Sequence, residues 1–361
     1  MLVQLTANSF RNLAPLAWRP AAGSHLLLGG NGAGKTSLLE TVYVLATTKS
    51  FRTPQVADCI RHGAELFHVE GEIEDERRVR LEVGYGKDWR LRTVNGRNAT
   101  LPEHLGVLPV VAWTTADVEI LTGAPRLRRR LMDRGVVGTR PAALEVLSRY
   151  RQALRHKRGL LASGGPGLEA WNGVLASAAA ELIARRAAYV AALREAFAQV
   201  VAEAELPIPA IELRYRPSPG SPGHAAAEEG PPSAEAIFAS LERLADRERQ
   251  RQLPLLGPHR DDLEVRWGDH EIARVASAGE RKALALLLIA AHGRVLKAAG
   301  ADPVYLLDDA DAELAIPTLA AVWKVFSGAR QMIATSNRPQ AWLTLPVDLL
   351  WRVEAGRIDP L

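Results

Sequence analysis

The feature that most constrains this chain is a phosphate-binding loop, because such a loop works only between a buried strand and the start of a helix. Residues 29–36 read G-G-N-G-A-G-K-T and fit the pattern G-x-x-x-x-G-K-[ST]. Glycines in this pattern let backbone N–H groups turn toward phosphate oxygens, and the following helix adds the positive end of its dipole. The largely apolar residues 25–28 predict the strand, and the run S-L-L-E-T-V-Y-V-L after the loop predicts the helix. This context favours a true phosphate loop over a chance glycine-rich turn.

The motif also assigns roles to side chains. Its lysine reaches the β- and γ-phosphates, and its Ser or Thr holds Mg²⁺. We therefore expect a nucleoside triphosphate with Mg²⁺, Lys35 in a catalytic position and Thr36 as a metal ligand. The loop residues expected to contact the nucleotide are Gly29, Gly30, Asn31, Gly32, Ala33, Gly34, Lys35, Thr36 and Ser37.

A pair of carboxylates follows a second apolar run. Residues 304–307 read V-Y-L-L, and Asp308 and Asp309 come next. Ligands of α/β sheets bind at the carboxyl ends of the strands, so Asp308 is expected to bind the metal, directly or through water. Asp309 is expected nearest the attacking water, as its orienter or general base. The alternative is a pair of surface aspartates that caps a helix.

A second candidate phosphate-binding turn lies at the start of another predicted helix. Residues 277–280 read S-A-G-E and precede the helix expected over residues 281–299. A serine, exposed N–H groups and a helix dipole together suit phosphate, so Ser277, Gly279 and Glu280 are predicted to bind nucleotide. The order of the three motifs resembles that of ABC-type ATPases, in which this turn contacts the ATP of a partner subunit. An ordinary helix N-cap is the alternative for Ser277.

Composition and organisation set the fold class. Of 361 residues, 47% are apolar and 24% charged, as in globular proteins, and a single cysteine, Cys59, excludes internal disulfides and Cys-based zinc sites. No signal peptide is apparent, and the longest apolar run, residues 283–291, is too short to span a bilayer, so we expect a cytoplasmic protein with no membrane partner.

The pattern of elements predicts an α/β protein with an insertion. Residues 1–120 alternate short strands with turns, and the Asn95-Gly96 pair predicts an antiparallel hairpin. Residues 121–252 have helical periodicity, interrupted at residues 163–167, and residues 206–232 resemble an exposed loop. Residues 253–361 return to α/β. We therefore predict a discontinuous head, 1–120 with 253–361, with a mixed sheet and an antiparallel N-terminal β region, and a helical lobe at 121–252.

Several segments resemble the RecF family, in the family's order and over nearly the whole chain. The most distinctive are G-P-H-R-D-D-L at residues 257–263 and P-R-L-R-R-R-L-M-D at residues 125–133. The other matching segments are F-R-N-L at 10–13, the phosphate loop, K-S-F-R at 49–52, residues 150–161 and L-L-D-D at 306–309.

The resemblance implies an ABC-type ATPase head with a compact helical lobe. It implies a homodimer formed on ATP, weak DNA-stimulated ATP hydrolysis, and binding to duplex and gapped DNA and to single-strand/double-strand junctions. It also implies recombinase loading in DNA replication and repair together with RecO and RecR. By the same likeness, Arg11 would lie near the nucleotide phosphates, and residues 335–337 would face the γ-phosphate.

Two departures of the chain from the family pattern concern the dimer interface and the metal site, and a milder one is E-R-K at residues 280–282, where the family has a Gln-rich sequence. The family usually shows S-E-L-D after the aspartates, whereas residues 312–315 read A-E-L-A. Two polar groups expected at the dimer interface are therefore missing, and Asp311 is expected to compensate in part. Residues 113–117 read W-T-T-A-D and keep only Asp117 of an acidic pair.

A basic segment predicts the DNA-binding surface. Between residues 126 and 158 there are eleven Arg or Lys and only two acidic residues, an excess of nine (eleven minus two), against +4 for the whole chain. Such an excess suits the phosphate backbone of duplex DNA, with Arg126, Arg128, Arg129 and Arg130 as the predicted contacts. The alternative is a solvated helix face with acidic partners elsewhere.

Other residues favour structural roles. Residues 259–262 read H-R-D-D, which we interpret as a hairpin stabilised by an Arg–Asp pair rather than a metal site. Cys59 is expected to be a small buried apolar residue. Two alternative functions remain: a subunit that energises a membrane transporter, and an SMC-type structural ATPase, for which the coiled coil is missing.

Overall fold

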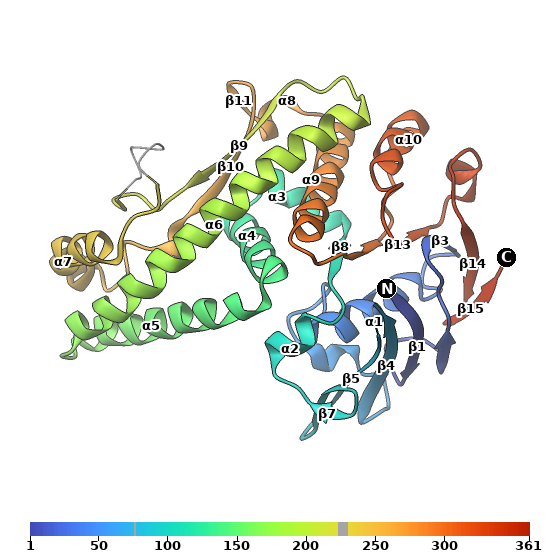
Figure 1. Ribbon diagram of the computed structural model, residues 1–361, viewed down its shortest axis with the longest axis horizontal. Helices are drawn as coiled ribbons and strands as arrows, with labels where there is room; N and C mark the ends of the chain where they lie inside the picture. The colour runs from blue at the N-terminus through green and yellow to red at the C-terminus, as the bar shows by residue number, and fades with distance from the viewer. Residues whose placement is uncertain (76, 223–229) are drawn as a thin grey trace. The chain divides into compact units, whose positions relative to one another are not determined.

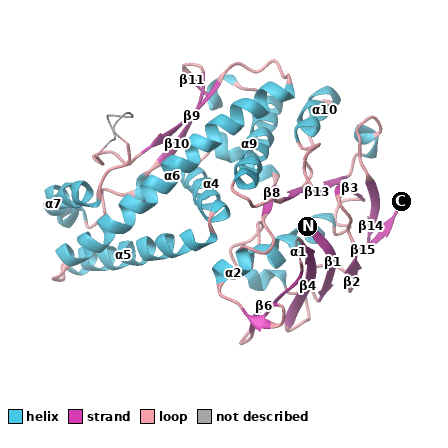
Figure 2. Cartoon of the chain, in the orientation of Figure 1, coloured by secondary structure: helices cyan, strands magenta, loops and turns pink. Residues whose placement is uncertain are grey.

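The computed structural model describes residues 1–75, 77–222 and 230–361, which form two compact units (Figure 1). The head unit consists of Met1–Val118, Gln199–Pro207 and Ser277–Leu361. The helical unit consists of Glu119–Ala198 and Ile208–Ala276. Figure 2 shows strands and helices mixed in the head unit, and mostly helices in the helical unit.

The first sheet of the head unit is antiparallel, as predicted for the N-terminal region. It has six strands in the order β2-β1-β4-β5-β6-β7. Their bounds are β1 Leu2–Asn8, β2 Leu16–Trp18, β4 Leu66–Glu74, β5 Arg78–Gly86, β6 Arg90–Val94 and β7 Arg97–Asn98. Asn95 (φ 50°) and Gly96 (φ 74°) close the β6–β7 hairpin with Val94 opposite Arg97, which confirms the predicted turn.

The second sheet of the head unit is mixed, which confirms the predicted fold class. Its order is β15-β14-β3-β13-β12-β8, in which only β15 runs antiparallel to its neighbour. The bounds are β3 Gly23–Leu28, β8 Val110–Trp113, β12 Val304–Leu307, β13 Gln331–Ser336, β14 Leu349–Glu354 and β15 Arg357–Pro360. The parallel strands β3, β12 and β13 therefore end side by side.

Helix α1 (Lys35–Thr47) lies in the core of the head unit. Every residue from Ser37 to Ala46 is buried, and its apolar side chains share one cluster with residues of both sheets, such as Leu5 and Ile333. A helix this apolar on all sides requires burial on all sides. Helices α9 (Ala278–Ala298) and α10 (Ile316–Val325) pack against each other, and α2 (Leu101–Leu105) is a short helix before β8.

The helical unit is built on long helices and a small sheet. Its helices are α3 Glu119–Thr122, α4 Pro125–Thr139, α5 Leu144–Ser163, most of α6 Leu168–Ala204, α7 Ala234–Arg251 and α8 Ile272–Val275. Residues of α5, α6 and α7 form its apolar core. Helix α5 ends where Gly164 adopts φ 67°, which confirms the predicted interruption.

Two predictions about the boundaries differ from the structure. Residues 211–216 form strand β9 (Ile211–Arg216) within the predicted exposed loop, because they pair with β10 (Asp262–Trp267) in the order β11-β10-β9. This pairing, with β11 at His270–Glu271, places 253–276 in the helical unit rather than in the head. The glycines and prolines around β9 concealed its alternation, and residues 223–229 of the predicted loop lie outside the described residues.

Within the described residues, each helix is either too short or too polar to cross a lipid bilayer.

Candidate nucleotide site

The phosphate loop leaves the carboxyl end of β3 and leads into α1. Gly34 precedes the helix with φ 114°, a left-handed conformation that favours glycine. A side chain at Gly29 would place its Cβ 2.2 Å from the carbonyl oxygen of Val353. The backbone N–H of Gly356 donates to the carbonyl of Ala33 at 2.8 Å. The loop is therefore shaped by its own glycines and by the β14–β15 hairpin.

Two asparagine side chains hold the phosphate loop through hydrogen bonds. Asn12 donates from Nδ2 to the carbonyl of Gly32 at 2.9 Å, and its Oδ1 accepts from Ser37 Oγ at 2.8 Å. Asn337, in the turn after β13, donates to Asn31 Oδ1 at 3.1 Å. The turn at residues 335–337 thus touches the phosphate loop, although its expected contact with a γ-phosphate stays a prediction.

Lys35 is buried, and its side chain extends back across the phosphate loop. Its Nζ donates to the carbonyls of Gly29 at 2.8 Å and Gly30 at 3.1 Å. Both acceptors are neutral, so these bonds leave the positive charge of Lys35 uncompensated at the loop. This is the placement that phosphate binding by Lys35 requires.

The first aspartate meets the phosphate loop, as predicted. Asp308 Oδ1 accepts from the hydroxyls of Thr36 and Thr335, both at 2.9 Å. Burial raises the pKa of the Asp308 carboxyl, the two threonine hydrogen bonds oppose this shift, and the neighbouring Asp309 adds to it. A threonine hydroxyl and a carboxylate are the hard oxygen ligands that Mg²⁺ prefers, so Thr36 and Asp308 fit the predicted metal site.

The second aspartate is held in an uncommon backbone conformation. Asp309 has φ 47°, and its N–H donates to Thr335 Oγ1 at 2.9 Å. Its Oδ1 is buried and finds no hydrogen-bond partner among the described residues. Buried acceptors are normally paired, so an unpaired carboxylate oxygen beside the phosphate loop indicates a place for a polar ligand or water.

These groups open onto a cleft of about 740 Å³ in the head unit. Its wall includes the phosphate loop, Asp309, Arg11 and the basic residues Arg52, Arg61 and His62. Arg11 is anchored from behind by the fully buried Glu40, with Nε to Oε2 at 2.9 Å and Nη2 to Oε1 at 2.8 Å. The structure thus places Arg11 at the cleft, while its contact with phosphates stays a prediction.

Sequence reasoning did not single out several of these residues. Asn12 and Arg52 lie in segments that carry the family resemblance, which was the available signal. Arg61 and His62 carry no motif of their own, because only the folded chain brings them to the cleft, and Glu40 acts from behind the wall by holding Arg11. Cys59 is fully buried, as predicted, and burial raises the pKa of its thiol to about 12.

The second phosphate-binding turn caps its own helix. Ser277 Oγ accepts from the N–H of Glu280 at 3.3 Å, and Glu280 Oε2 accepts from the N–H of Ser277 at 2.8 Å. These bonds lower the pKa of the Glu280 carboxyl. Ser277, Gly279 and Glu280 are not among the residues lining the cleft of their own chain. Contact with a partner's nucleotide therefore stays a prediction, and the capping role is what the single chain shows.

The expectation for Asp311 is wrong. Its side chain is buried, with the residue only 1% exposed, and Oδ2 accepts from Ser336 Oγ at 2.6 Å and from Trp342 Nε1 at 3.1 Å. A carboxylate held inside its own chain cannot replace polar groups at an interface. Asp117 accepts from the N–H of Thr114 at 2.7 Å and so stabilises its own turn.

The predicted DNA-binding arginines do not form one free patch. Arg128 binds Asp262 through two bonds of 2.8 Å, and Arg129 donates to the carbonyl of Asp261 at 2.7 Å. Arg126 and Arg130 are exposed, and no ion pair forms with either among the described residues. Other basic residues of the segment form the ion pairs Arg149–Glu181, Arg151–Asp133 and Lys157–Glu248. Part of the charge excess is thus neutralised by acidic residues distant in sequence, as the alternative interpretation held.

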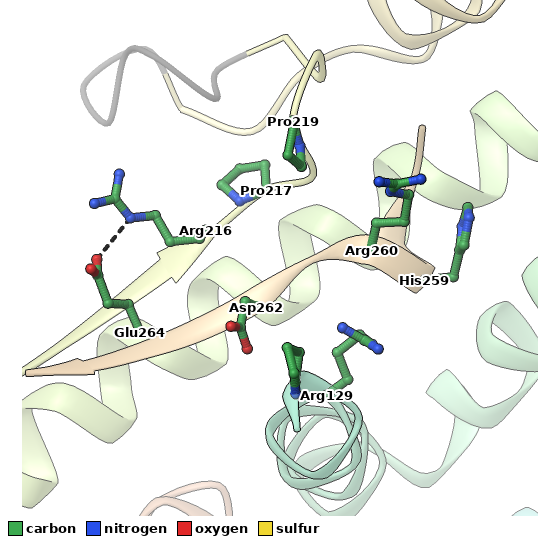
Figure 3. A pocket seen from close by; sticks show the side chains of 9 residues that line it. Arg129, Arg216, Pro217, Pro219, His259, Arg260, Asp262 and Glu264 are labelled. Carbon is green, nitrogen blue, oxygen red and sulfur yellow. Dashed lines mark hydrogen bonds and ion pairs between the residues drawn. The ribbon is translucent and has the colours of Figure 1, made fainter. Parts of the chain in front are cut away.

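A hollow of about 570 Å³ in the helical unit lies beside these residues (Figure 3). Figure 3 shows Arg129 rising from α4 and Arg260 from the segment before β10. Arg216 is engaged by Glu264 at 2.8 Å, and Asp262 also lines the hollow, so its net positive charge is small.

The G-P-H-R-D-D-L segment has a structural role, but the predicted hairpin is wrong. Residues 258–260 form a 3₁₀ turn that leads into β10, and the pairing arginine is distant in sequence. Fully buried Asp261 pairs with Arg186 at 3.1 Å and accepts from the N–H of Ser218 at 2.9 Å. His259 accepts from Tyr150 Oη at 2.7 Å through Nδ1, and burial lowers its pKa to about 4. No cluster of potential metal ligands occurs in the part of the chain that the structure describes.

Comparison with known proteins agrees with this geometry. The family model RecF/RecN/SMC N terminal domain matches residues 1–345. The chain is 32% identical to the DNA replication and repair protein RecF of Anaeromyxobacter sp. (strain Fw109-5), over 100% of this chain and 99% of that protein. It is 33% identical to the protein of the same name from Myxococcus xanthus (strain DK1622), over 99% of this chain and 96% of that protein.

Solved structures share the fold. The recombination mediator protein RecF, solved as RecF-ATPrS in the RecFOR pathway, matches with a TM-score of 0.87 at 24% identity, over 100% of this chain and 98% of that one. An Smc head bound to the C-winged helix domain of ScpA matches with a TM-score of 0.58 at 17% identity, over 100% and 96% of the two chains. The family model and the shared fold place the chain in the class of RecF/RecN/SMC-type head domains, with a phosphate loop in the expected position. Within that class, the chain belongs to the RecF family. This assignment disfavours a transporter subunit.

Proposed function

We propose that the protein is a recombination mediator of DNA replication and repair that binds ATP with Mg²⁺, dimerises on ATP and binds DNA. The observation that carries the proposal is the hydrogen bond of 2.9 Å between Thr36 and Asp308, which joins two motifs 272 residues apart at one cleft. Family membership supports the biological role, and so do the relatives, which are a DNA replication and repair protein and a recombination mediator protein.

In this proposal each cleft residue has a distinct task. Lys35 compensates phosphate charge, Thr36 and Asp308 hold Mg²⁺, and Asp309 orients the attacking water. Bound Mg²⁺ neutralises charge on the phosphate oxygens. Arg11, fixed by Glu40, adds positive charge at the same wall.

Turnover is expected to be slow, on the order of one per minute or less, far below the enzyme median of about ten per second. An aspartate is one methylene shorter than the glutamate that usually follows the metal aspartate in ABC transporters, so Asp309 orients water less well. The A-E-L-A sequence at 312–315 also lacks polar groups that order a closed dimer. ATP therefore acts as a dimerisation switch more than as a metabolic substrate.

The proposed dimer and DNA contacts rest on exposed residues, and the proposed protein partners rest on a solved relative. Ser277 lies exposed at the start of α9 and is proposed to contact the nucleotide of a second copy. Arg126 and Arg130 on α4 are proposed to contact the DNA backbone, at duplex, gapped or junction sites. The solved relative RecF belongs to the RecFOR pathway, so we propose RecO and RecR as partners of this protein and the cytoplasm as its location.

Sedimentation with and without ATP tests this function. Wild type is expected to shift from monomer to dimer on ATP with Mg²⁺, because Ser277 completes the nucleotide site of a partner. Lys35→Met is expected to bind no ATP and stay monomeric. Lys297→Met is a matched control, since it removes an exposed lysine at the far end of α9, outside the cleft. Dimers of Lys35→Met at the ATP concentration that saturates wild type would contradict the proposal.

A further inference from the structure

The segment that follows β12 is held on one side by helix α9. The Nζ of Lys282 is buried and donates to the carbonyl oxygens of Asp309, at 3.1 Å, and Ala312, at 2.5 Å. The N–H of Asp309 is in turn bound by Thr335 at 2.9 Å. The backbone of Asp309 is therefore fixed at both its N–H and its carbonyl, while Oδ1 of its carboxylate is left without a partner.

The opposite side of the segment is held by Asp311. Its Oδ2 accepts from Ser336 Oγ at 2.6 Å and from Trp342 Nε1 at 3.1 Å. Its carbonyl accepts from Arg338 Nη1 at 2.8 Å. These partners come from the end of β13, the short link after it and the 3₁₀ turn Pro339–Trp342, so Asp311 ties the segment after β12 to the segment after β13.

The segment after β13 is also the one that touches the phosphate loop. Asn337 donates to Asn31, and Thr335 contacts both Asp308 and Asp309. Asp309, Asp311 and the phosphate loop therefore all contact the same short segment at the end of β13. Asp309 has a left-handed backbone conformation with φ 47°, and a non-glycine residue keeps such a conformation only when its surroundings hold it there.

We propose that Asp311 is a positioning residue for hydrolysis: it fixes the segment after β12 so that the Asp309 carboxylate faces the cleft. The inference rests on the proposed function, in which Asp309 orients the attacking water. A buried carboxylate is a costly way to gain stability alone, since an apolar residue of similar size often does as well. Asp311 does not contact Lys35 or Thr36, so its loss affects the orientation of Asp309 and not the binding of phosphate.

The test separates ATP affinity from hydrolysis. Asp311→Ala is expected to bind ATP as wild type does in equilibrium titration, but to lose roughly tenfold or more in kcat, since small displacements of a catalytic group cost this much. Asp311→Asn keeps an oxygen that accepts from Ser336 and Trp342, and it is expected to retain most of kcat. A purely structural role would lower the melting temperature and the ATP affinity together.

A double variant shows whether the effect passes through Asp309. In the Asp309→Asn background, Asp311→Ala is expected to cause no further loss of kcat, because the group that it positions is already gone. An equal loss in both backgrounds, or an unchanged kcat in Asp311→Ala alone, would overturn the inference. Wild type that binds ATP but hydrolyses none would instead refute the role of Asp309 in the proposed function, and this inference with it.

If Asp311→Ala does not fold, single-bond variants serve the same purpose. Ser336→Ala and Trp342→Phe each remove one donor to Asp311 and leave the carboxylate in place. Each is expected to lower kcat by less than Asp311→Ala without changing ATP affinity. Wild-type kcat in both variants would overturn the inference.

Discussion

Removing two exposed arginines of α4 is expected to weaken DNA binding while leaving the fold intact. Arg126 and Arg130 are four positions apart on one helix, so they lie on the same face. The first turn of α4 carries no acidic residue, so nothing there offsets the helix dipole or the arginine charge. Each lost phosphate contact lowers the slope of log affinity against log salt by about 0.9, so Arg126→Ala with Arg130→Ala should flatten it by about 1.8.

Arg128 is expected to behave in the opposite way. Its two bonds of 2.8 Å to Asp262 hold α4 against β10, and a third of 2.8 Å to the carbonyl of Gly123 holds the turn before α4. Hydrogen bonds to charged groups contribute about 1.5–3 kcal/mol each, but the Asp262 side chain is 31% exposed and regains water when Arg128 is lost. We therefore expect Arg128→Ala to cost about 2 kcal/mol of unfolding free energy. Its effect on the salt slope should be small.

The assay is fluorescence anisotropy of a labelled duplex, with ATP, over a series of salt concentrations, beside urea unfolding of each variant. Arg247→Ala with Arg251→Ala is the matched control, because these exposed residues are also four apart on one helix, α7 of the same unit. The control removes the same charge and is expected to keep the wild-type slope. An unchanged slope and affinity in the stable Arg126/Arg130 variant would show that DNA binds elsewhere. Lost affinity in Arg128→Ala without lost stability would refute the structural role of Arg128.

Three further results are expected. Lys157 and Glu248 form a fully buried ion pair at 2.6 Å, so Lys157→Met should cost about 3–5 kcal/mol in urea unfolding, and the added change Glu248→Gln should recover most of it. Burial in the folded protein lowers the pKa of His259 from 6.5 to about 4, so between these pH values only the unfolded chain gains the proton. The free energy of unfolding should therefore fall by about 3 kcal/mol as the pH drops from 6.5 to 4. His259→Gln should flatten this pH dependence. Asp309→Asn should trap an ATP-bound dimer, measured as a sedimenting species that outlasts the wild-type dimer; prompt dissociation would count against its role in hydrolysis.

The parts of the site that could be predicted are those written in short local segments. The phosphate loop and the V-Y-L-L-D-D segment each predict a strand and the chemistry at its carboxyl end. In a parallel sheet these carboxyl ends lie at the same edge. Thr36 and Asp308 therefore meet as expected, although 272 residues separate them. The mixed sheet followed from the same reasoning.

The parts that could not be predicted depend on partners distant in sequence. A local count of charge cannot show that Asp262 pairs with Arg128 across 134 positions, nor that Asp311 turns inward toward Trp342. Strand β9 was concealed because its pairing partner, β10, lies beyond the whole of α7. In each case the observed structure depends on a tertiary contact, and no local sequence pattern indicates that contact.

The contact between the phosphate loop and the last hairpin also sets the order in which the protein can mature. Gly29 lies against the carbonyl of Val353, and Ala33 accepts from Gly356, so the nucleotide site is completed by residues close to Leu361. These residues lie far downstream of the loop, so they are made long after it. A nascent chain therefore exposes a glycine-rich loop that lacks its support until β14 and β15 have been made. A chain cut short before β14 is expected to lose nucleotide binding even though every motif residue is present.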